Sequence, residues 1–199
     1  MVPQTGLRGA GVMVAVVGPS GSGKDTLIAV ARERYAGNRW VVFPQRIVTR
    51  NSLPEAENHA SVSEQEFAAI DHAGGFATSW RAHGLAYGIA ASIDADIRDG
   101  RVVVANVSRQ AIDPLRRRYP TVHVASVTAR EEILTRRLKA RGRESDAEIA
   151  RRVARARSFA RPRPPLTVID NSGALADAAD AFLNVLASYV PAGGADAGW

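Results

Sequence analysis

The residues best suited to chemistry form one glycine-rich stretch: Gly18, Pro19, Ser20, Gly21, Ser22, Gly23, Lys24, Asp25 and Thr26. An apolar run at 12–17 precedes it and an apolar-periodic segment at 27–35 follows it, which predicts a strand, a turn and a helix in that order. Glycines let a loop curl so that its N–H groups point at phosphate oxygens, and a helix N-terminus adds partial positive charge. Lys24 is placed to reach the outer phosphates of a nucleotide. An ordinary Gly/Ser turn is the alternative, but this order favours a phosphate-binding loop for ATP.

Asp25 departs from the usual form of such a loop. The residue after the lysine is normally Ser or Thr, whose hydroxyl binds Mg²⁺, whereas here a carboxylate follows the lysine and Thr26 comes next. Bound phosphates would repel that carboxylate unless a cation lay between them. We therefore interpret Asp25, with Thr26 beside it, as the metal-binding part of the loop. The alternative is that Asp25 only begins the helix, where the helix dipole favours an acid.

Positive charge is concentrated in the C-terminal third of the chain. Residues 130–163 hold twelve Lys/Arg against five Asp/Glu, a net charge of +7, whereas the whole chain carries +6. The rest of the chain therefore carries −1, and the basicity is local. A nucleic-acid surface is one interpretation of such a segment, but Phe159 is its single aromatic residue. Clamping the phosphates of a small ligand is the better interpretation, so we expect no nucleic-acid partner.

Length and composition indicate one domain, which we place at 12–190. A chain of 199 residues with 46% apolar residues can bury a full core, and without Cys it has no disulfide or thiolate site. Residues 1–11 and 191–199, rich in Gly and small residues, are expected to be disordered ends. We find no run of roughly 18 apolar residues that would span a membrane and no signal-peptide core. ATP chemistry then suggests the cytoplasm, while the oligomeric state stays open, a homodimer included.

Strands alternate with helices along the chain, which predicts an α/β fold. The expected architecture is a three-layer parallel sheet with its ligand at the carboxyl ends of the strands. Capping boxes at Ser63, Thr128 and Ser145 predict helix starts. The expected strands are 12–17, 40–43, 46–50, 101–107, 121–127 and 166–169, together with a hairpin of 76–82 and 85–88. The expected helices are 27–35, 64–72, 89–99, 110–119, 131–140, 146–159 and 174–189.

The loop and the order of the elements resemble the guanylate kinase family of P-loop kinases. That resemblance implies an acceptor-binding subdomain, about 44–88, and a basic lid, about 140–157, whose arginines close on the transferring phosphate. Arg141 and Arg152, eleven residues apart, match the lid arginines. Two features depart from the family: residues 77–80 lack the glutamate that reads guanine, and the predicted strand at 101–107 has Asn106 but no carboxylate.

These departures resemble one branch, the ribose 1,5-bisphosphate phosphokinases of bacterial phosphonate degradation (the carbon–phosphorus lyase pathway). The matching pieces are Gly-Lys-Asp at 23–25, Ile-Val-Thr-Arg at 47–50, Glu-Asn-His at 57–59, Ser-Glu-Gln-Glu-Phe at 63–67, Ser-Trp-x-Ala-x-Gly-Leu-x-Tyr-Gly at 79–88, Asn-x-Ser-Arg at 106–109 and Arg-Gly-Arg-Glu at 141–144. The resemblance spans roughly 12–190. It implies ATP- and Mg²⁺-dependent phosphorylation of ribose 1,5-bisphosphate at its 1-phosphate, giving 5-phosphoribosyl 1-diphosphate and ADP.

On that resemblance, Lys24, Arg141 and Arg152 are the catalytic residues. The acceptor side would use arginines, whose planar guanidinium binds phosphate through two hydrogen bonds, and polar groups for the sugar. The residues assigned to it are Arg46, Arg50, Glu57, Asn58, His59, Tyr87, Asn106 and Arg109. Each arginine could instead be a solvated surface charge, and Trp80 and Tyr87 could belong to the core of the subdomain. The other histidines show no metal-ligand spacing and are interpreted as structural.

Three other functions remain open at this stage. A nucleoside monophosphate kinase is disfavoured by the missing guanine-reading glutamate. A non-catalytic binding module of the guanylate kinase type is disfavoured by the intact glycine loop, by Lys24 and by the arginine-rich lid. A basic nucleic-acid binder would show a steep dependence of its affinity on salt.

Overall fold

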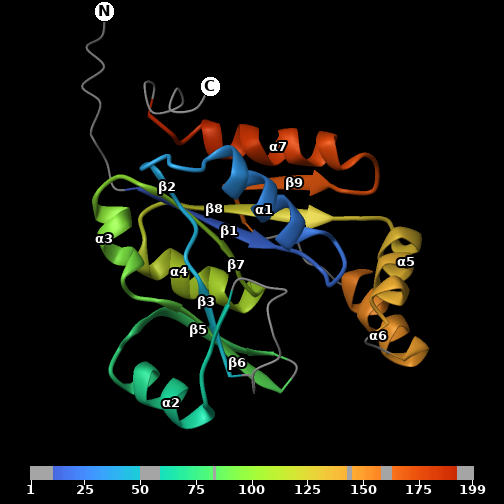
Figure 1. The fold of residues 1–199 in the computed structure, drawn as a ribbon, viewed down its shortest axis with the longest axis horizontal. Helices are drawn as coiled ribbons and strands as arrows, with labels where there is room; N and C mark the ends of the chain where they lie inside the picture. Colours follow the sequence, from blue (N-terminus) through green and yellow to red (C-terminus); the bar gives the residue numbers. More distant parts are fainter. Residues whose placement is uncertain (1–10, 50–58, 83, 143–144, 158–162, 192–199) are drawn as a thin grey trace, which may run out of the picture.

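In a computed structural model, the protein is described over residues 11–49, 59–82, 84–142, 145–157 and 163–191, and at 141 and 155–157 by the backbone alone. A five-stranded sheet forms its centre (Figure 1), and all four strand pairings are parallel. The strands follow the order β2 (Val41–Val42), β7 (Val102–Asn106), β1 (Val12–Val17), β8 (Val122–Thr128) and β9 (Leu166–Asp170). The predicted parallel α/β sheet is therefore confirmed. Its β-branched runs are buried because helices cover both faces.

Helices pack on the two faces of this sheet and make the three expected layers. One face carries α1 (Lys24–Arg34) and α7 (Leu175–Ala187), and its core includes Leu27 and Phe182, both fully buried. The other face carries α3 (Ile93–Arg98) and α4 (Ile112–Arg118), with Leu115 fully buried in its core. A 3₁₀ turn, η1 (Arg109–Ala111), leads into α4. Every helix in the described ranges is too short or too polar to cross a bilayer.

A second, four-stranded sheet lies below the first in Figure 1. Its order is β4 (His59–Ser61), β3 (Arg46–Val48), β6 (Leu85–Ala90) and β5 (Phe76–Ala82). One face packs on α2 (Glu64–His72), where the rings of Phe67 and Phe76 stack with centroids 4.6 Å apart. The other face joins the core of the main sheet through Trp80 and Ile89. The predicted hairpin and the capping box of Ser63 with Glu66 are both confirmed.

Two basic helices, α5 (Glu131–Arg141) and α6 (Asp146–Arg157), pair with each other at one side of the main sheet (Figure 1). The capping box at Ser145 is confirmed, because Ser145 N–H donates to Glu148 Oε2 at 2.8 Å and Glu148 N–H donates back to Ser145 Oγ at 3.4 Å. The capping box at Thr128 is wrong. Thr128 belongs to β8, paired with Asp170 of β9, and its hydroxyl donates to the Ile169 carbonyl.

Three other expectations differ from the structure. The helix predicted at 89–99 is wrong at its start, because β6 continues to Ala90 and α3 begins only at Ile93. Pairing across the sheet overrides local helix preference there, and Ile89 is buried in the core. The helix predicted at 110–119 begins as a 3₁₀ turn. Gly11, expected in a disordered end, is buried and its N–H donates to the Ile97 carbonyl; residues 1–10 and 192–199 lie outside the described residues.

Candidate active site

The glycine loop connects β1 to α1 at the carboxyl end of the sheet, where ligands of parallel α/β proteins bind. Glycine is required at two of its positions. At Gly18, φ is +153° and an added Cβ would lie 2.2 Å from the Val127 carbonyl oxygen. At Gly23, φ is +92° and a Cβ would lie 2.2 Å from Asn171 Nδ2. The loop is therefore wedged between β8 and the end of β9, in a conformation that a larger residue would break.

Lys24 lies over this loop. Its ammonium group donates to the carbonyls of Gly18 and Pro19 at 2.9 and 3.0 Å, so the cation lies where the loop curls. Asn171, which follows β9 and is 2% exposed, donates its Nδ2–H to the Ser22 carbonyl at 2.8 Å. The backbone of the loop is thus held by a buried amide, and the charge of Lys24 is positioned before any ligand arrives. This arrangement suits phosphate binding.

Asp25, expected to bind metal, lies exposed in the first turn of α1, and Thr26 next to it is exposed as well. Asp25 Oδ1 accepts a hydrogen bond of 2.7 Å from Nδ2 of Asn106, the last residue of β7. In the described part of the chain, no three or more His, Cys, Asp or Glu side chains gather as a metal cluster. The metal roles of Asp25 and Thr26 therefore remain predictions, and the contact of Asp25 with Asn106 is a new observation.

Asp94 and Asp96 are the other acids that could be considered for a metal, and the structure places them elsewhere. Asp94 accepts from Arg118 Nε at 2.9 Å and from the Tyr119 hydroxyl at 2.7 Å. The Arg118 hydrogen bonds hold the pKa of the Asp94 carboxyl below its usual range. Asp96 pairs with Arg101, which precedes β7, at 2.9 Å. Asp94 thus ties α3 to the end of α4, and Asp96 ties α3 to the segment that leads into β7.

The small sheet brings Arg46, His59 and Tyr87 onto one face. Arg46 and His59 are register partners on neighbouring strands, and the Arg46 guanidinium lies 5.4 Å from the centroid of the Tyr87 ring. Trp80 stacks on Tyr87 from the next strand, with centroids 5.6 Å apart and planes 9° apart. His59 Nδ1 is buried and makes no hydrogen bond within the described residues. Such an array of cation, imidazole and aromatic edge suits an anionic, hydroxyl-bearing ligand.

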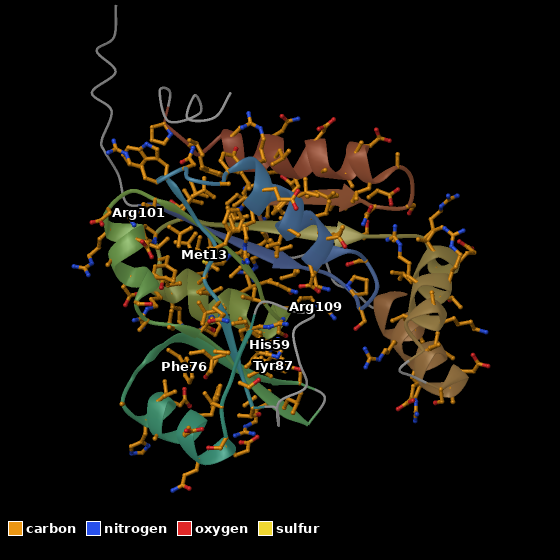
Figure 2. The ribbon with its side chains drawn as sticks, viewed as in Figure 1. Met13, His59, Phe76, Tyr87, Arg101 and Arg109 are labelled. Atoms are coloured by element: carbon orange, nitrogen blue, oxygen red, sulfur yellow. The ribbon has the colours of Figure 1, made fainter. Side chains whose placement is uncertain are left out.

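Arg109, also assigned to the acceptor side, approaches the small sheet from the end of β7. It lies on η1, which packs on β5, and Figure 2 shows it in the same region as His59 and Tyr87. Trp80 is 8% exposed and part of the core, which favours its structural interpretation. Arg50, Glu57 and Asn58, also expected at the acceptor side, lie outside the described residues.

The two basic helices, α5 and α6, reach the glycine loop. Arg152 Nη1 on α6 donates to the Ser20 hydroxyl at 2.9 Å, which places the predicted lid arginine at the phosphate-binding loop. Arg137 Nη1 on α5 donates to the Gly21 carbonyl at 3.4 Å, a contact not predicted from the sequence. Its position four residues before Arg141 puts both on one helix face and could have suggested it. Arg141 ends α5, and its side chain is outside the described residues.

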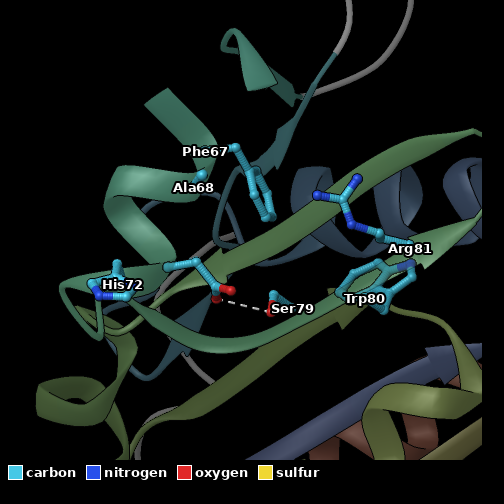
Figure 3. Close-up of a pocket in the computed structure, with 7 residues that line it drawn as sticks. Phe67, Ala68, His72, Ser79, Trp80 and Arg81 are labelled. Atoms are coloured by element: carbon cyan, nitrogen blue, oxygen red, sulfur yellow. Dashed lines mark hydrogen bonds between the residues drawn. The ribbon is translucent and has the colours of Figure 1, made fainter. Parts of the chain in front are cut away.

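A hollow of about 510 Å³ lies apart from these groups, between α2 and β5 (Figure 3). Three of its polar side chains have partners: Ser79 donates to Asp71 at 3.0 Å, and Arg81 bridges to Glu64 at 3.2 Å. All of its lining residues come from α2 and β5, so it does not include the glycine loop. The candidate active site therefore comprises the glycine loop, the residues of α5 and α6 that contact it, and the face of the small sheet that carries Arg46, His59 and Tyr87.

Comparisons with known proteins agree with this geometry. A family model described as "AAA domain" matches residues 14–155. Among solved structures, the chain is similar in fold to guanylate kinase from Anaplasma phagocytophilum, with a TM-score of 0.62, 18% identity, and coverage of 92% of this chain and 89% of that one. A sugar kinase from Janibacter is also similar, with a TM-score of 0.53, 16% identity and coverage of 91% and 96%.

Relatives in sequence identify the family more narrowly than the structural comparisons do. A relative named ribose 1,5-bisphosphate phosphokinase PhnN in Brucella melitensis is 45% identical over 88% of this chain and 92% of its own length. Relatives of the same name in Rhodopseudomonas palustris and Pseudofrankia inefficax are 46% and 48% identical, covering 88% and 89% of this chain and 89% and 92% of their own lengths. The glycine loop, the two basic helices and the small sheet thus occur in a chain that belongs to the ribose 1,5-bisphosphate phosphokinase family of P-loop kinases.

Proposed function

We propose that the protein transfers the γ-phosphoryl group of ATP to the 1-phosphate of ribose 1,5-bisphosphate, forming 5-phosphoribosyl 1-diphosphate and ADP. Membership of the family supports the reaction. The observation that carries the acceptor class is the composition of the small sheet, whose four strands contain no Asp or Glu. A guanine base would need an acceptor for its N–H groups, whereas Arg46 and His59 suit a phosphate and a sugar.

The reaction requires little from the protein beyond positioning and charge. The second pKa of a phosphate monoester is about 6, so the acceptor phosphate is already a nucleophile at neutral pH and no general base is needed. The loop N–H groups and Lys24 would hold the β- and γ-phosphates, and Arg152 would move from the Ser20 hydroxyl to the transferring group. Arg137 lies beside the same loop and adds a second lid cation there.

Mg²⁺ fits the residues that are present. The ion prefers oxygen ligands, keeps several waters, and needs only one or two carboxylates besides the substrate phosphates. Asp25 offers one exposed carboxylate beside the loop, with the Thr26 hydroxyl next to it. When bound, Mg²⁺ would neutralise charge on the phosphates during transfer. Asp25 and Thr26 are the residues that we assign to it, and ATP is the assigned donor.

Substrate contacts are assigned to the two sides of the site. Arg46, His59, Tyr87, Asn106 and Arg109 are the described residues that the family resemblance assigns to the acceptor side. Arg50, Glu57 and Asn58 keep the roles implied by the family resemblance. The acceptor subdomain corresponds to about 44–88 and the lid to about 140–157, with Arg141 as the second lid arginine. Because ATP is the assigned donor, we place the protein in the cytoplasm, acting on small molecules rather than on nucleic acid or membrane.

An acceptor panel tests this proposal. The protein is incubated with Mg-ATP and, in turn, ribose 1,5-bisphosphate, ribose 5-phosphate or GMP. ADP is measured by a coupled assay, and ³¹P NMR identifies a new diphosphate signal. We expect turnover with ribose 1,5-bisphosphate and the diphosphate product. ADP formation with GMP at a comparable rate would instead assign the protein to the nucleotide kinases.

A further inference from the structure

Asp25 and Asn106 meet at the carboxyl end of the main sheet, although 81 positions separate them in the sequence. Asn106 Nδ2 donates to Asp25 Oδ1 at 2.7 Å. The register pairs Asn106 with Val16, so β7 ends beside the strand that leads into the glycine loop. Asp25 is exposed and Asn106 is partly exposed. The contact therefore lies at the surface that would face the phosphates of a bound nucleotide.

The pair reverses the usual distribution of charge in a P-loop site. Such sites commonly hold Mg²⁺ with a neutral Ser or Thr hydroxyl after the lysine and with an Asp from a neighbouring strand. Here the carboxylate follows Lys24, and a neutral carboxamide ends β7. The two positions together still carry one negative charge, but that charge lies on the loop instead of on the strand.

We infer that Asn106 is a positioning residue that orients the Asp25 carboxylate toward the cation of the donor nucleotide. The inference rests on the proposed function, because it takes a metal-bound ATP as the donor. The carboxamide N–H satisfies one carboxylate oxygen and fixes its direction, which leaves the second oxygen for a cation. An Asp at position 106 beside Asp25 would bring two anions into contact, and each would disfavour the other's charge. Neutral Asn106 at the end of β7 and acidic Asp25 after Lys24 therefore act together at one metal-binding position.

This role differs from the acceptor-binding role that the resemblance implies for Asn106. If Asn106 bound the sugar phosphate, its removal would raise KM for that acceptor and leave metal binding unchanged. If Asn106 positions Asp25, its removal weakens metal binding to the enzyme–nucleotide complex, even with no acceptor present. The two roles are therefore separable by measurement.

The test compares four variants with the wild type: Asn106→Ala, Asp25→Asn, the exchange Asp25→Asn with Asn106→Asp, and the matched control Asn184→Ala on exposed α7 surface. Mn²⁺ binding is measured by electron paramagnetic resonance in the presence of a non-hydrolysable ATP analogue. We expect Asn106→Ala to weaken Mn²⁺ binding about tenfold, the lower end for losing a group that orients a metal ligand. Asp25→Asn weakens it at least as much, and the control leaves it unchanged.

Asn106→Ala is the decisive variant, because it removes the hydrogen bond and leaves the Asp25 carboxylate in place. The exchange variant then tests whether the two positions together need one carboxylate. It restores one carboxylate and one amide, with the hydrogen bond reversed in direction, so it should recover most of the affinity lost in Asp25→Asn. The inference is overturned if Asn106→Ala binds Mn²⁺ as tightly as the wild type does. It is also overturned if the exchange variant binds Mn²⁺ no more tightly than Asp25→Asn alone. A raised KM for ribose 1,5-bisphosphate with normal Mn²⁺ binding overturns it as well. If Asn106→Ala fails to fold, Asn106→Ser, which also leaves Asp25 in place, replaces it in the Mn²⁺ measurement.

The same measurements separate this inference from the proposed function. Mn²⁺ binding to the enzyme–analogue complex needs no acceptor. A wild-type protein that binds Mn²⁺ with the analogue, shows the expected rescue and yet does not phosphorylate ribose 1,5-bisphosphate would refute the acceptor assignment and support the positioning role. A protein that phosphorylates the acceptor but shows no rescue would support the acceptor assignment and refute the positioning role.

Discussion

Replacing Arg152 by Ala should slow phosphoryl transfer without loosening the fold. Its Nη1 donates to the Ser20 hydroxyl at 2.9 Å, so the guanidinium already lies at the loop that would hold the phosphates. One positioned donor to charge that develops in the transition state contributes about 10²- to 10³-fold in rate. Because Arg152 is partly exposed, water screens its charge, and we expect the lower range. The predicted loss in kcat/KM is about 10- to 100-fold, or about 1.4–2.7 kcal/mol.

Stability should change little in this variant. Helix α6 is held by the Ser145 capping box and by Ile149, which is 3% exposed, and neither contact involves the Arg152 side chain. We expect the melting temperature to stay within about 2 °C of the wild type, as for a surface substitution. Arg152→Lys keeps the charge but loses the planar pair of donors, so its activity should be intermediate.

Arg151→Ala is the matched control, since it removes the same charge from the neighbouring, exposed position. The assay is initial-rate ADP formation with saturating ribose 1,5-bisphosphate and varied ATP, followed by varied acceptor. The reasoning is refuted if Arg152→Ala keeps wild-type kcat/KM, or if Arg151→Ala loses as much activity. In either case Arg152 would be an ordinary surface charge of a basic helix. The resemblance predicts a similar loss for Arg141→Ala.

Three further predictions follow from the same structure. GMP should be a very poor acceptor, because none of the four strands of the small sheet offers a carboxylate to the base; a steady-state assay with GMP showing turnover like that of the ribose bisphosphate would contradict this. Asp25→Asn should raise the Mg²⁺ concentration needed for half-maximal rate and lower kcat, with little change in melting temperature. Asp25→Ser should recover only part of the activity. An unchanged Mg²⁺ requirement in Asp25→Asn would show that Asp25 serves the helix start instead. Burial lowers the pKa of His123, which contacts the Tyr189 and Thr167 hydroxyls at 2.9 and 3.0 Å. The unfolded chain therefore binds the proton more readily, so the free energy of unfolding should decrease as pH falls below about 6.5. Denaturant unfolding between pH 7.5 and pH 5 should show a smaller decrease of this free energy in His123→Gln than in the wild type. Equal decreases in the two proteins would exclude this role of His123.

Local chemistry was enough to predict the glycine loop and most of the strands. The glycines and Lys24 lie close together in the chain, so their arrangement follows from local sequence, and a short apolar run rich in β-branched residues is typical of a strand buried on both faces. The capping boxes at Ser63 and Ser145 were predictable for the same reason, since each joins residues only three apart.

Two secondary-structure predictions were wrong because strands distant in the sequence pair with the segment in question. Thr128 has the residue types of a helix start, yet pairing with β9 keeps it in a strand. Ile89 continues the four-residue spacing of Ile93 and Ile97, which suggested a helix, yet pairing with β5 and burial of Ile89 extend β6 through residues 89 and 90. In both cases hydrogen bonds between strands outweigh a local preference of a few tenths of a kcal/mol per residue.

The site itself was predicted as a set of residues, but its contacts came only from the tertiary structure. Nothing in the sequence places the Asn106 amide on Asp25, since the parallel register of β7 beside β1 brings them together. The lid contact of Arg137 with the glycine loop likewise depends on how α5 docks. Sequence alone determined which chemical groups this protein carries and which short segments form its elements. Tertiary structure decided which groups touch, because side chains far apart in the chain meet only after the strands between them have taken their order.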